Sequence, residues 1–231
     1  MKALYLIFAA CLSEQPEPPL AKLKMHEPNP FTCQAKAYDD WFARHPATYQ
    51  AELAAIRTLL PSGGKGIEIG VGTGRFAAPL GIGLGVEPIR AMATIAKARR
   101  VTVVQGMAET LPLASGLFDF ALMVTVDCFL DDLALSLLEV YRVLGPRACL
   151  LLGFIDRESW LGKEYRLGQK KCRFYRQARF HSPTDLEKAL RAAGFGSLLW
   201  RQTLLPEQAL AGQVLEGHGR GGFVVVRAEK G

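Results

Sequence analysis

Three glycines alternate along one loop of the chain, at Gly70, Gly72 and Gly74. They follow a short apolar strand expected at 66–69, and a helix is expected to begin near Thr73. Alternating glycines lack the β-carbons that would keep a ligand away from backbone N–H groups at a helix N-terminus, although tight turns also use glycine for steric reasons alone. Glu68 precedes the first glycine by two residues. Its carboxylate would repel a pyrophosphate and attract a ligand with an ammonium or sulfonium group.

A second carboxylate, Glu87, follows Glu68 by nineteen residues, at the end of the next expected strand at 83–86. At this distance from a glycine loop, a carboxylate accepts hydrogen bonds from both hydroxyls of a ribose. The alternative is that Glu87 is a surface carboxylate that precedes Pro88 and binds no ligand. A dinucleotide fingerprint needs its third glycine one place after Gly74, where this chain has Arg75. A nicotinamide-dependent oxidoreductase is therefore the least favoured function.

The elements that position these residues alternate between strand and helix. Five strands are expected at 66–69, 83–86, 101–104, 118–124 and 148–154, with two more at 197–205 and 222–227. The runs 101–104, 121–124 and 149–152 are continuously apolar, as in strands that helices cover on both faces. Helices are expected at 35–44, 47–60, 131–144 and 182–194. Because parallel strands end at one edge of a sheet, we expect the residues that follow them to converge there.

The composition describes one well-buried globular domain of 231 residues, with 49% apolar residues and a net charge of +6. Five scattered cysteines without a Cys-x-x-Cys pair suggest neither a disulfide framework nor a zinc site, so we expect no metal and a cytoplasmic location. The apolar run 3–12 is too short to span a bilayer, and no membrane partner is expected. It resembles a signal-peptide core, and translation from Met25 is the simpler explanation.

An insertion at about 155–180 interrupts the alternation of strand and helix. It carries a basic run, made up of Lys163, Arg166, Lys170, Lys171, Arg173, Arg176 and Arg179. Such a run is typical of a solvated face, and the alternative is a surface that binds RNA or another anion.

An acidic residue two places before three alternating glycines resembles the first motif of class I S-adenosylmethionine-dependent methyltransferases. Further motifs of this family follow in order at 85–88, 105–112, 118–119, 141–144, 179–182 and 193–195. The resemblance covers residues 38–205, and the late motifs are similar to those of the small-molecule branch, the type 11 methyltransferases.

The resemblance implies an α/β fold, a Rossmann-like doubly wound sheet of seven strands with helices on both faces. The sheet would be mostly parallel, with an antiparallel last strand. Residues 1–34 would be a flexible N-terminal extension, and residues 35–231 the methyltransferase domain, with the insertion at about 155–180 as a lid.

The resemblance also implies S-adenosyl-L-methionine as the cofactor. Its expected binding residues are Tyr38, Glu68, Gly70, Gly72, Gly74, Glu87, Pro88, Met92, Ala108, Glu109, Thr125 and Phe129. Pro88 and Met92 would border the adenine, and Tyr38 would lie on a helix over the cofactor or simply pack in the core. Met107 departs from the family pattern, which often has an aspartate that contacts the adenine amino group. Glu109 or the backbone of Ala108 would take that contact.

No catalytic motif stands out, which suits methyl transfer because positioning supplies most of its acceleration. If a base is used, Asp127 and His181 are the first candidates, although each has a structural alternative as a cap or a residue before a helix. The Asn/Asp-Pro-Pro-Tyr/Phe signature of base amino-group methylation is absent at 125–129, which disfavours that reaction on nucleic acid.

The sequence therefore predicts a methyltransferase that acts on a small molecule bound beneath the Tyr38 helix and the insertion. An RNA-directed methyltransferase and a non-catalytic S-adenosylmethionine-binding protein are the alternatives. Oligomeric state and the methylated atom do not follow from the sequence.

Overall fold

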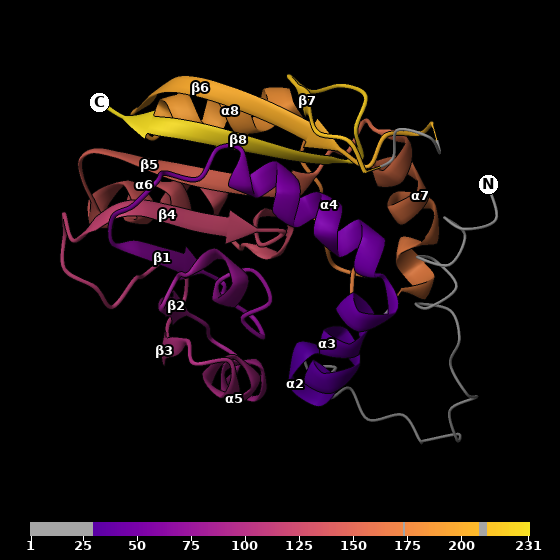
Figure 1. Ribbon diagram of the computed structural model, residues 1–231, viewed down its shortest axis with the longest axis horizontal. Helices are drawn as coiled ribbons and strands as arrows, with labels where there is room; N and C mark the ends of the chain where they lie inside the picture. Colours follow the sequence, from indigo (N-terminus) through magenta and orange to yellow (C-terminus); the bar gives the residue numbers. More distant parts are fainter. Residues whose placement is uncertain (1–29, 173, 208–211) are drawn as a thin grey trace.

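The computed structural model describes residues 30–172, 174–207 and 212–231, which fold around one mixed sheet. The strands lie in the order β3-β2-β1-β4-β5-β8-β6-β7 (Figure 1). Their bounds are β1 Gly66–Ile69, β2 Leu84–Val86, β3 Thr102–Val104, β4 Phe118–Val124, β5 Leu144–Ile155, β6 Phe195–Thr203, β7 Leu215–Glu216 and β8 Phe223–Lys230. The expected doubly wound α/β fold is confirmed, with β7 as an eighth, two-residue strand at the edge.

The first five strands are parallel and the last three are antiparallel additions. β1 pairs with β2 and β4, β2 with β3, and β4 with β5, all in parallel. β8 runs antiparallel between β5 and β6 along most of its length. The expected antiparallel last strand is therefore present, and it lies inside the sheet rather than at its edge.

Helices cover both faces of the sheet (Figure 1). The α-helices are α2 Pro30–Cys33, α3 Ala35–Arg44, α4 Pro46–Arg57, α5 Arg90–Ala98, α6 Leu133–Val143, α7 Trp160–Gly168 and α8 Pro183–Ala192. Side chains cap several of them. The Asp132 carboxylate accepts a hydrogen bond from Leu135 N, and Ser182 and Asp185 form a capping box at the start of α8.

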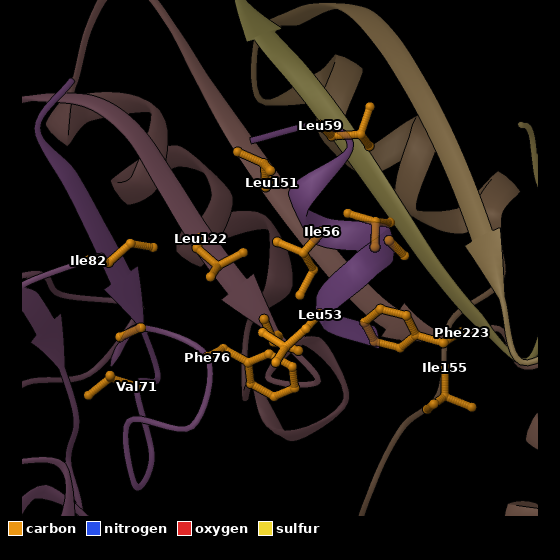
Figure 2. Packing of buried hydrophobic residues seen from close by; sticks show 14 of the residues in the cluster. Leu53, Ile56, Leu59, Val71, Phe76, Ile82, Leu122, Leu151, Ile155 and Phe223 are labelled. Carbon is orange, nitrogen blue, oxygen red and sulfur yellow. The ribbon is translucent and has the colours of Figure 1, made fainter. Parts of the chain in front are cut away.

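The two sides of the strands bury different clusters. On one face, Leu53, Ile56 and Leu59 from the α4 region point toward Leu122 and Leu151 (Figure 2). On the other face, alternate residues of β4 and β5 pack with α6 and α8. This burial on both sides explains why the two strands read as continuous apolar runs.

The third apolar run has a different environment. We expected the strand at 101–104 to be covered on both faces, but β3 lies at the edge of the sheet. Thr102 is exposed, and Val103 and Val104 are only half-buried. Strand order, which the run itself does not encode, decides this difference.

The helix expected near Thr73 is absent. The glycine loop continues through turns to a single 3-10 turn, η1 Ala78–Leu80, which Gly81 ends in a left-handed conformation. Pro79 lacks a backbone N–H and restricts the residue before it, which opposes a longer helix here. The loop thus offers individual backbone N–H groups rather than the end of an α-helix.

The insertion at about 155–180 forms α7 and a 3-10 turn, η3 Gln169–Lys171. Together with α2 and α3, α7 lies beyond the arrowheads of β1 and β4 (Figure 1). Of the expected N-terminal extension, α2 packs against the domain through Phe31, and residues 1–29 lie outside the described residues. Among the described residues, no helix has the length and apolar character needed to cross a bilayer.

Candidate active site

The predicted site segments meet at one edge of the sheet. The glycine loop follows β1, Glu87 follows β2, Ala108 and Glu109 follow β3, and 125–129 follows β4. Because these four strands are parallel neighbours, their carboxyl ends lie at the same edge. The chain connections change direction between β1 and β4, which is where doubly wound sheets bind their ligands.

Glu87 is fixed by backbone donors on two sides. Gly72 N donates to its Oε2 and Ile89 N donates to its Oε1, both at 2.9 Å. Burial raises the pKa of this carboxyl, and the two N–H groups oppose the rise. Each carboxylate oxygen keeps a second lone pair. Glu87 can therefore accept hydrogen bonds from a pair of hydroxyls.

Glu68 is more deeply buried, with 2% of its surface exposed. Burial raises its pKa well above the ordinary value, against a hydrogen bond from the Ala77 backbone, and the charge of Glu87 raises it further. Its Oε2 is buried and has no hydrogen-bond partner among the described residues. A buried, unpartnered carboxylate oxygen beside the glycine loop points to a ligand that carries a donor or a positive charge.

The glycine loop combines close packing with left-handed backbone. A β-carbon on Gly70, whose φ is +70°, would lie 2.4 Å from Val126 Cγ2, so this position must be glycine for steric reasons. A β-carbon on Gly72 would meet only Met92 Cε, at 3.6 Å. The two glycines therefore have different roles. Gly70 lets the loop contact the segment after β4, and Gly72 presents its N–H to Glu87.

Helix α3 is anchored over the loop by an ion pair. Arg75 Nε donates to Asp39 Oδ1, and Arg99 Nη2 donates to Asp39 Oδ2, each at 2.8 Å. The preceding residue, Tyr38, contacts the ring of Phe42, and its hydroxyl is buried. Burial raises the pKa of Tyr38, and the charges of nearby carboxylates, Glu68 and Glu87 among them, raise it further. Tyr38 is thus within electrostatic reach of the two carboxylates of the predicted cofactor site.

The two candidate bases, Asp127 and His181, are hydrogen-bonded to each other. His181 Nδ1 lies 2.9 Å from Asp127 Oδ2. Asp127 is 2% exposed, and burial raises its pKa while the bond to His181 opposes the rise. With Asp127 as the acceptor, the proton is on Nδ1 and the other ring nitrogen of His181 is free to accept one. Fifty-four residues separate the pair in sequence, so spacing alone does not predict the contact.

The remaining predicted residues line the same edge in different ways. Glu109 Oε1 accepts a hydrogen bond from Asp131 N at 3.0 Å, and its Oε2 has no partner among the described residues. Thr125 follows β4 in a left-handed conformation, with φ of 52°. Phe129 is exposed over 37% of its surface and contacts Phe31. Pro88 is exposed, whereas Met92 and Ala108 are buried.

The carboxylates of the site fit S-adenosylmethionine. Glu87 suits a ribose, and the unpartnered Glu68 oxygen and the surrounding carboxylates suit a cation such as a sulfonium or an α-ammonium. Among the described residues, no three His, Cys, Asp or Glu side chains cluster so as to hold a metal ion.

Two features of the site were missed by the sequence analysis. Asp39, which holds Arg75 and Arg99, was not singled out, and a buried acid on an amphipathic helix was the only available signal. Glu52 on α4 was also passed over, although it is only 6% exposed.

Comparison with known proteins agrees with this geometry. The methyltransferase domain family matches residues 67–152, from β1 into β5. A crystal structure of an S-adenosylmethionine-dependent methyltransferase from Thermotoga maritima superposes with a TM-score of 0.83, at 48% identity over 87% of this chain and 98% of that one. An Archaeoglobus fulgidus methyltransferase shares the fold, with a TM-score of 0.66 at 16% identity over 84% of this chain and 99% of that one.

An uncharacterised protein of Methanocaldococcus jannaschii is 39% identical over 204 residues, which are 87% of this chain and 99% of the relative. The similarity therefore extends beyond the matched domain to the N-terminal helices and the C-terminal strands. With its glycine loop, its Glu87 and its strand order, the chain belongs to the class I S-adenosylmethionine-dependent methyltransferases of the type 11 branch.

Proposed function

We propose that this enzyme transfers the methyl group of S-adenosylmethionine to a small-molecule acceptor bound beneath α3 and α7. The observation that carries the proposal is Glu87, a buried carboxylate held by Gly72 N and Ile89 N beside the unpartnered oxygen of Glu68. When bound, the cofactor supplies an activated methyl group on a sulfonium whose leaving group is a neutral thioether.

The chain's own residues hold this cofactor from several sides. We assign to its binding Tyr38, Glu68, Gly70, Gly72, Gly74, Glu87, Pro88, Met92, Ala108, Glu109, Thr125 and Phe129. Glu87 binds the ribose hydroxyls, Glu68 compensates positive charge, and Tyr38 closes the site from α3. With both reactants fixed, orientation supplies most of the acceleration.

We assign to His181 the removal of a proton from the acceptor. Its Nδ1–H donates to Asp127, and its second ring nitrogen is the base. Asp127 is a positioning residue that fixes the tautomer and orientation of the ring.

The charges favour a small acceptor over RNA. The side chains of the basic run, among them Lys163, Arg166 and Lys171, are exposed on α7 and η3, whereas the buried ionisable side chains at the site are acidic. A polyanion would meet repulsion there. The Thermotoga maritima relative is described as a possible histamine N-methyltransferase, which supports a small nitrogen-containing acceptor. A cytoplasmic location, where S-adenosylmethionine is made, is part of the proposal.

Calorimetric titration of the purified protein with S-adenosylmethionine, S-adenosylhomocysteine and NAD tests the proposal. We expect saturable binding of the first two, weakened about tenfold or more in Glu87→Ala, which is roughly 1.4 kcal/mol. Glu164→Gln removes an exposed carboxylate of α7 and serves as the control with unchanged affinity. Binding of NAD, or S-adenosylmethionine affinity that Glu87→Ala does not alter, would contradict the proposal.

A further inference from the structure

Glu52 is a mostly buried acidic side chain that has no hydrogen-bond or ion-pair partner among the described residues. It lies on the inner side of α4 with 6% of its surface exposed, among the apolar residues Ala51, Leu53 and Ala55. Among the described residues, no side chain or backbone N–H bonds to its carboxylate. Burial, acting alone, raises the pKa of Glu52 to about 8. Proteins rarely leave a carboxylate in such a place unless it binds something.

Aromatic residues surround this part of the molecule. Tyr38, Tyr165 and Tyr175 pack against the cluster that the neighbours of Glu52 help to form. The rings of Tyr165 and Tyr175 are 4.9 Å apart, and those of Tyr175 and Phe129 are 5.6 Å apart. Aromatic faces attract cations, and they do so most strongly where water is excluded.

The charge of Glu52 acts on these tyrosines. Burial raises the pKa of both Tyr38 and Tyr165, and of the neighbouring charges Glu52 raises it most in each case. The charges of Glu68 and Glu87 also act on Tyr38 but do not figure among the causes for Tyr165. Tyr38 is therefore within electrostatic reach both of the cofactor carboxylates and of Glu52.

Among the residues that the structure describes, no cationic side chain forms an ion pair with Glu52. Arg75 and Arg99 are engaged by Asp39, and Arg179 donates to the backbone oxygen of Leu130. A metal ion is not favoured either, since no cluster of three or more ligating side chains occurs among the described residues. The missing partner is therefore expected to be an organic cation.

We propose that the methyl acceptor is a small organic amine, and that Glu52 binds its protonated nitrogen within the ring cluster of Tyr38, Tyr165 and Tyr175. This inference rests on the proposed function, because it assigns the substrate class of the same site. Glu52 recognises the substrate by binding its protonated nitrogen. The methyl group goes to a different atom of the substrate, such as a second nitrogen.

The test is transfer of a labelled methyl group to matched acceptors by the full-length enzyme. Phenethylamine, 2-phenylethanol and 3-phenylpropionate share a ring and differ in the terminal group, and histamine adds a second nitrogen. Histamine has a second nitrogen to receive the methyl group, so we expect it to be methylated. Phenethylamine has a single nitrogen without a lone pair when protonated, so we expect it to compete with histamine without being methylated. The alcohol and the carboxylate should neither be methylated nor compete. In Glu52→Gln the KM for the amine should rise about 30- to 100-fold, because a charge-assisted bond is lost.

Two further variants separate recognition from folding. Glu52→Asp keeps the charge and should retain more of the affinity than Glu52→Gln. Glu164→Gln removes an exposed charge of α7 and should leave the KM unchanged. The affinity of every variant for S-adenosylhomocysteine should equal that of the wild type, which shows that the fold and the cofactor site are intact.

The outcomes distinguish the two proposals. Methylation of the alcohol or the carboxylate in place of the amines, or an amine KM that Glu52→Gln leaves within about twofold, would overturn the role of Glu52 alone. Failure of the wild type to bind S-adenosylhomocysteine would overturn the proposed function itself. Intact binding without transfer to any of these acceptors would overturn the assignment of an amine substrate and leave the proposed function standing.

Discussion

Arg75 grips both carboxylate oxygens of Asp39: its Nε lies 2.8 Å from Oδ1 and its Nη2 lies 2.8 Å from Oδ2. Arg75 directly follows the last glycine of the loop, and Asp39 directly follows Tyr38 on α3. Arg99, at the end of α5, adds a second guanidinium to Asp39. A parallel two-bond pair fixes orientation as well as distance. Arg75 stands where a dinucleotide fingerprint has its third glycine, and through Asp39 it holds α3 against the glycine loop.

The first prediction compares two adjacent aspartates of α3. Asp39→Asn should lower the free energy of unfolding by about 2–4 kcal/mol, because it leaves two guanidinium groups poorly paired in a mostly buried place. Asp40→Asn breaks only the exposed pair with Lys36 and should cost less than about 0.5 kcal/mol. Urea denaturation of both variants gives the two values, and equal losses would show that Asp39 does not fasten the helix.

The same pair gives a pH dependence. Burial by itself would raise the pKa of Asp39, but hydrogen bonds from Arg75 and Arg99 lower it below the ordinary value. A carboxyl whose pKa is lower in the folded state stabilises the fold above its unfolded pKa and loses this effect as the pH falls. The stability difference between wild type and Asp39→Asn should therefore shrink in acid.

The second prediction compares the stability cost of alanine at two glycines, one where a side chain would be crowded and one where only the backbone would be strained. Gly70 and Gly81 have nearly equal φ values, +70° and +73°. A β-carbon on Gly70 collides with Val126, whereas one on Gly81 meets no atom within 4 Å. Gly81→Ala should cost about 1 kcal/mol from strain alone, and Gly70→Ala clearly more, from strain and overpacking. Thermal unfolding measures both, and similar costs would mean that the segment after β4 moves aside easily.

The third prediction concerns His181. On the proposed role of His181 as the base, His181→Ala should lower kcat about 100-fold and leave the affinity for S-adenosylhomocysteine unchanged, because the ring would move a proton and would not hold the cofactor. Added imidazole should restore part of the rate, which a purely structural role would not allow. His218→Ala, which changes an exposed histidine beside Trp200, is the control. Unaltered turnover in His181→Ala would remove the residue from the mechanism.

The fourth prediction is that Glu52 destabilises the free enzyme at high pH. Its folded pKa of about 8 lies above the ordinary 4.5, so its contribution to stability is full below the unfolded pKa and is lost as the pH rises through about 8. Glu52→Gln should therefore match the wild type near pH 5 and exceed its free energy of unfolding by about 2–5 kcal/mol at pH 9.

The tyrosines on which the charge of Glu52 acts do not obscure this change. Burial raises the pKa of Tyr38, Tyr165 and Tyr175, which keeps them neutral at pH 9. Urea denaturation at the two pH values measures the effect, with Glu164→Gln as the control. A wild type as stable as Glu52→Gln at pH 9 would show that the carboxyl finds water or a partner in the folded state.

The sequence by itself determined the fold class and the chemistry of the cofactor site. Apolar runs at 121–124 and 149–152 predict strands buried on both faces, and alternating glycines after an acid predict a ligand loop. These signals are local, because the pattern of apolar residues and the backbone freedom of glycine are properties of residues that are close together in the chain. For this reason α3 has the predicted bounds, and α6 and α8 begin close to the predicted starts at 131 and 182.

Only the tertiary structure decided which distant side chains meet. Asp127 and His181 are far apart in sequence, as are Asp39 and Arg75, and each pair forms because helices and loops pack over a common edge of the sheet. Burial of Glu52 depends in the same way on the packing of α4 against its neighbours. Strand order placed β3 at the edge of the sheet, and the helix expected near Thr73 did not form. Pairing and desolvation are properties of the assembled chain, so the local pattern that predicts each element does not contain them.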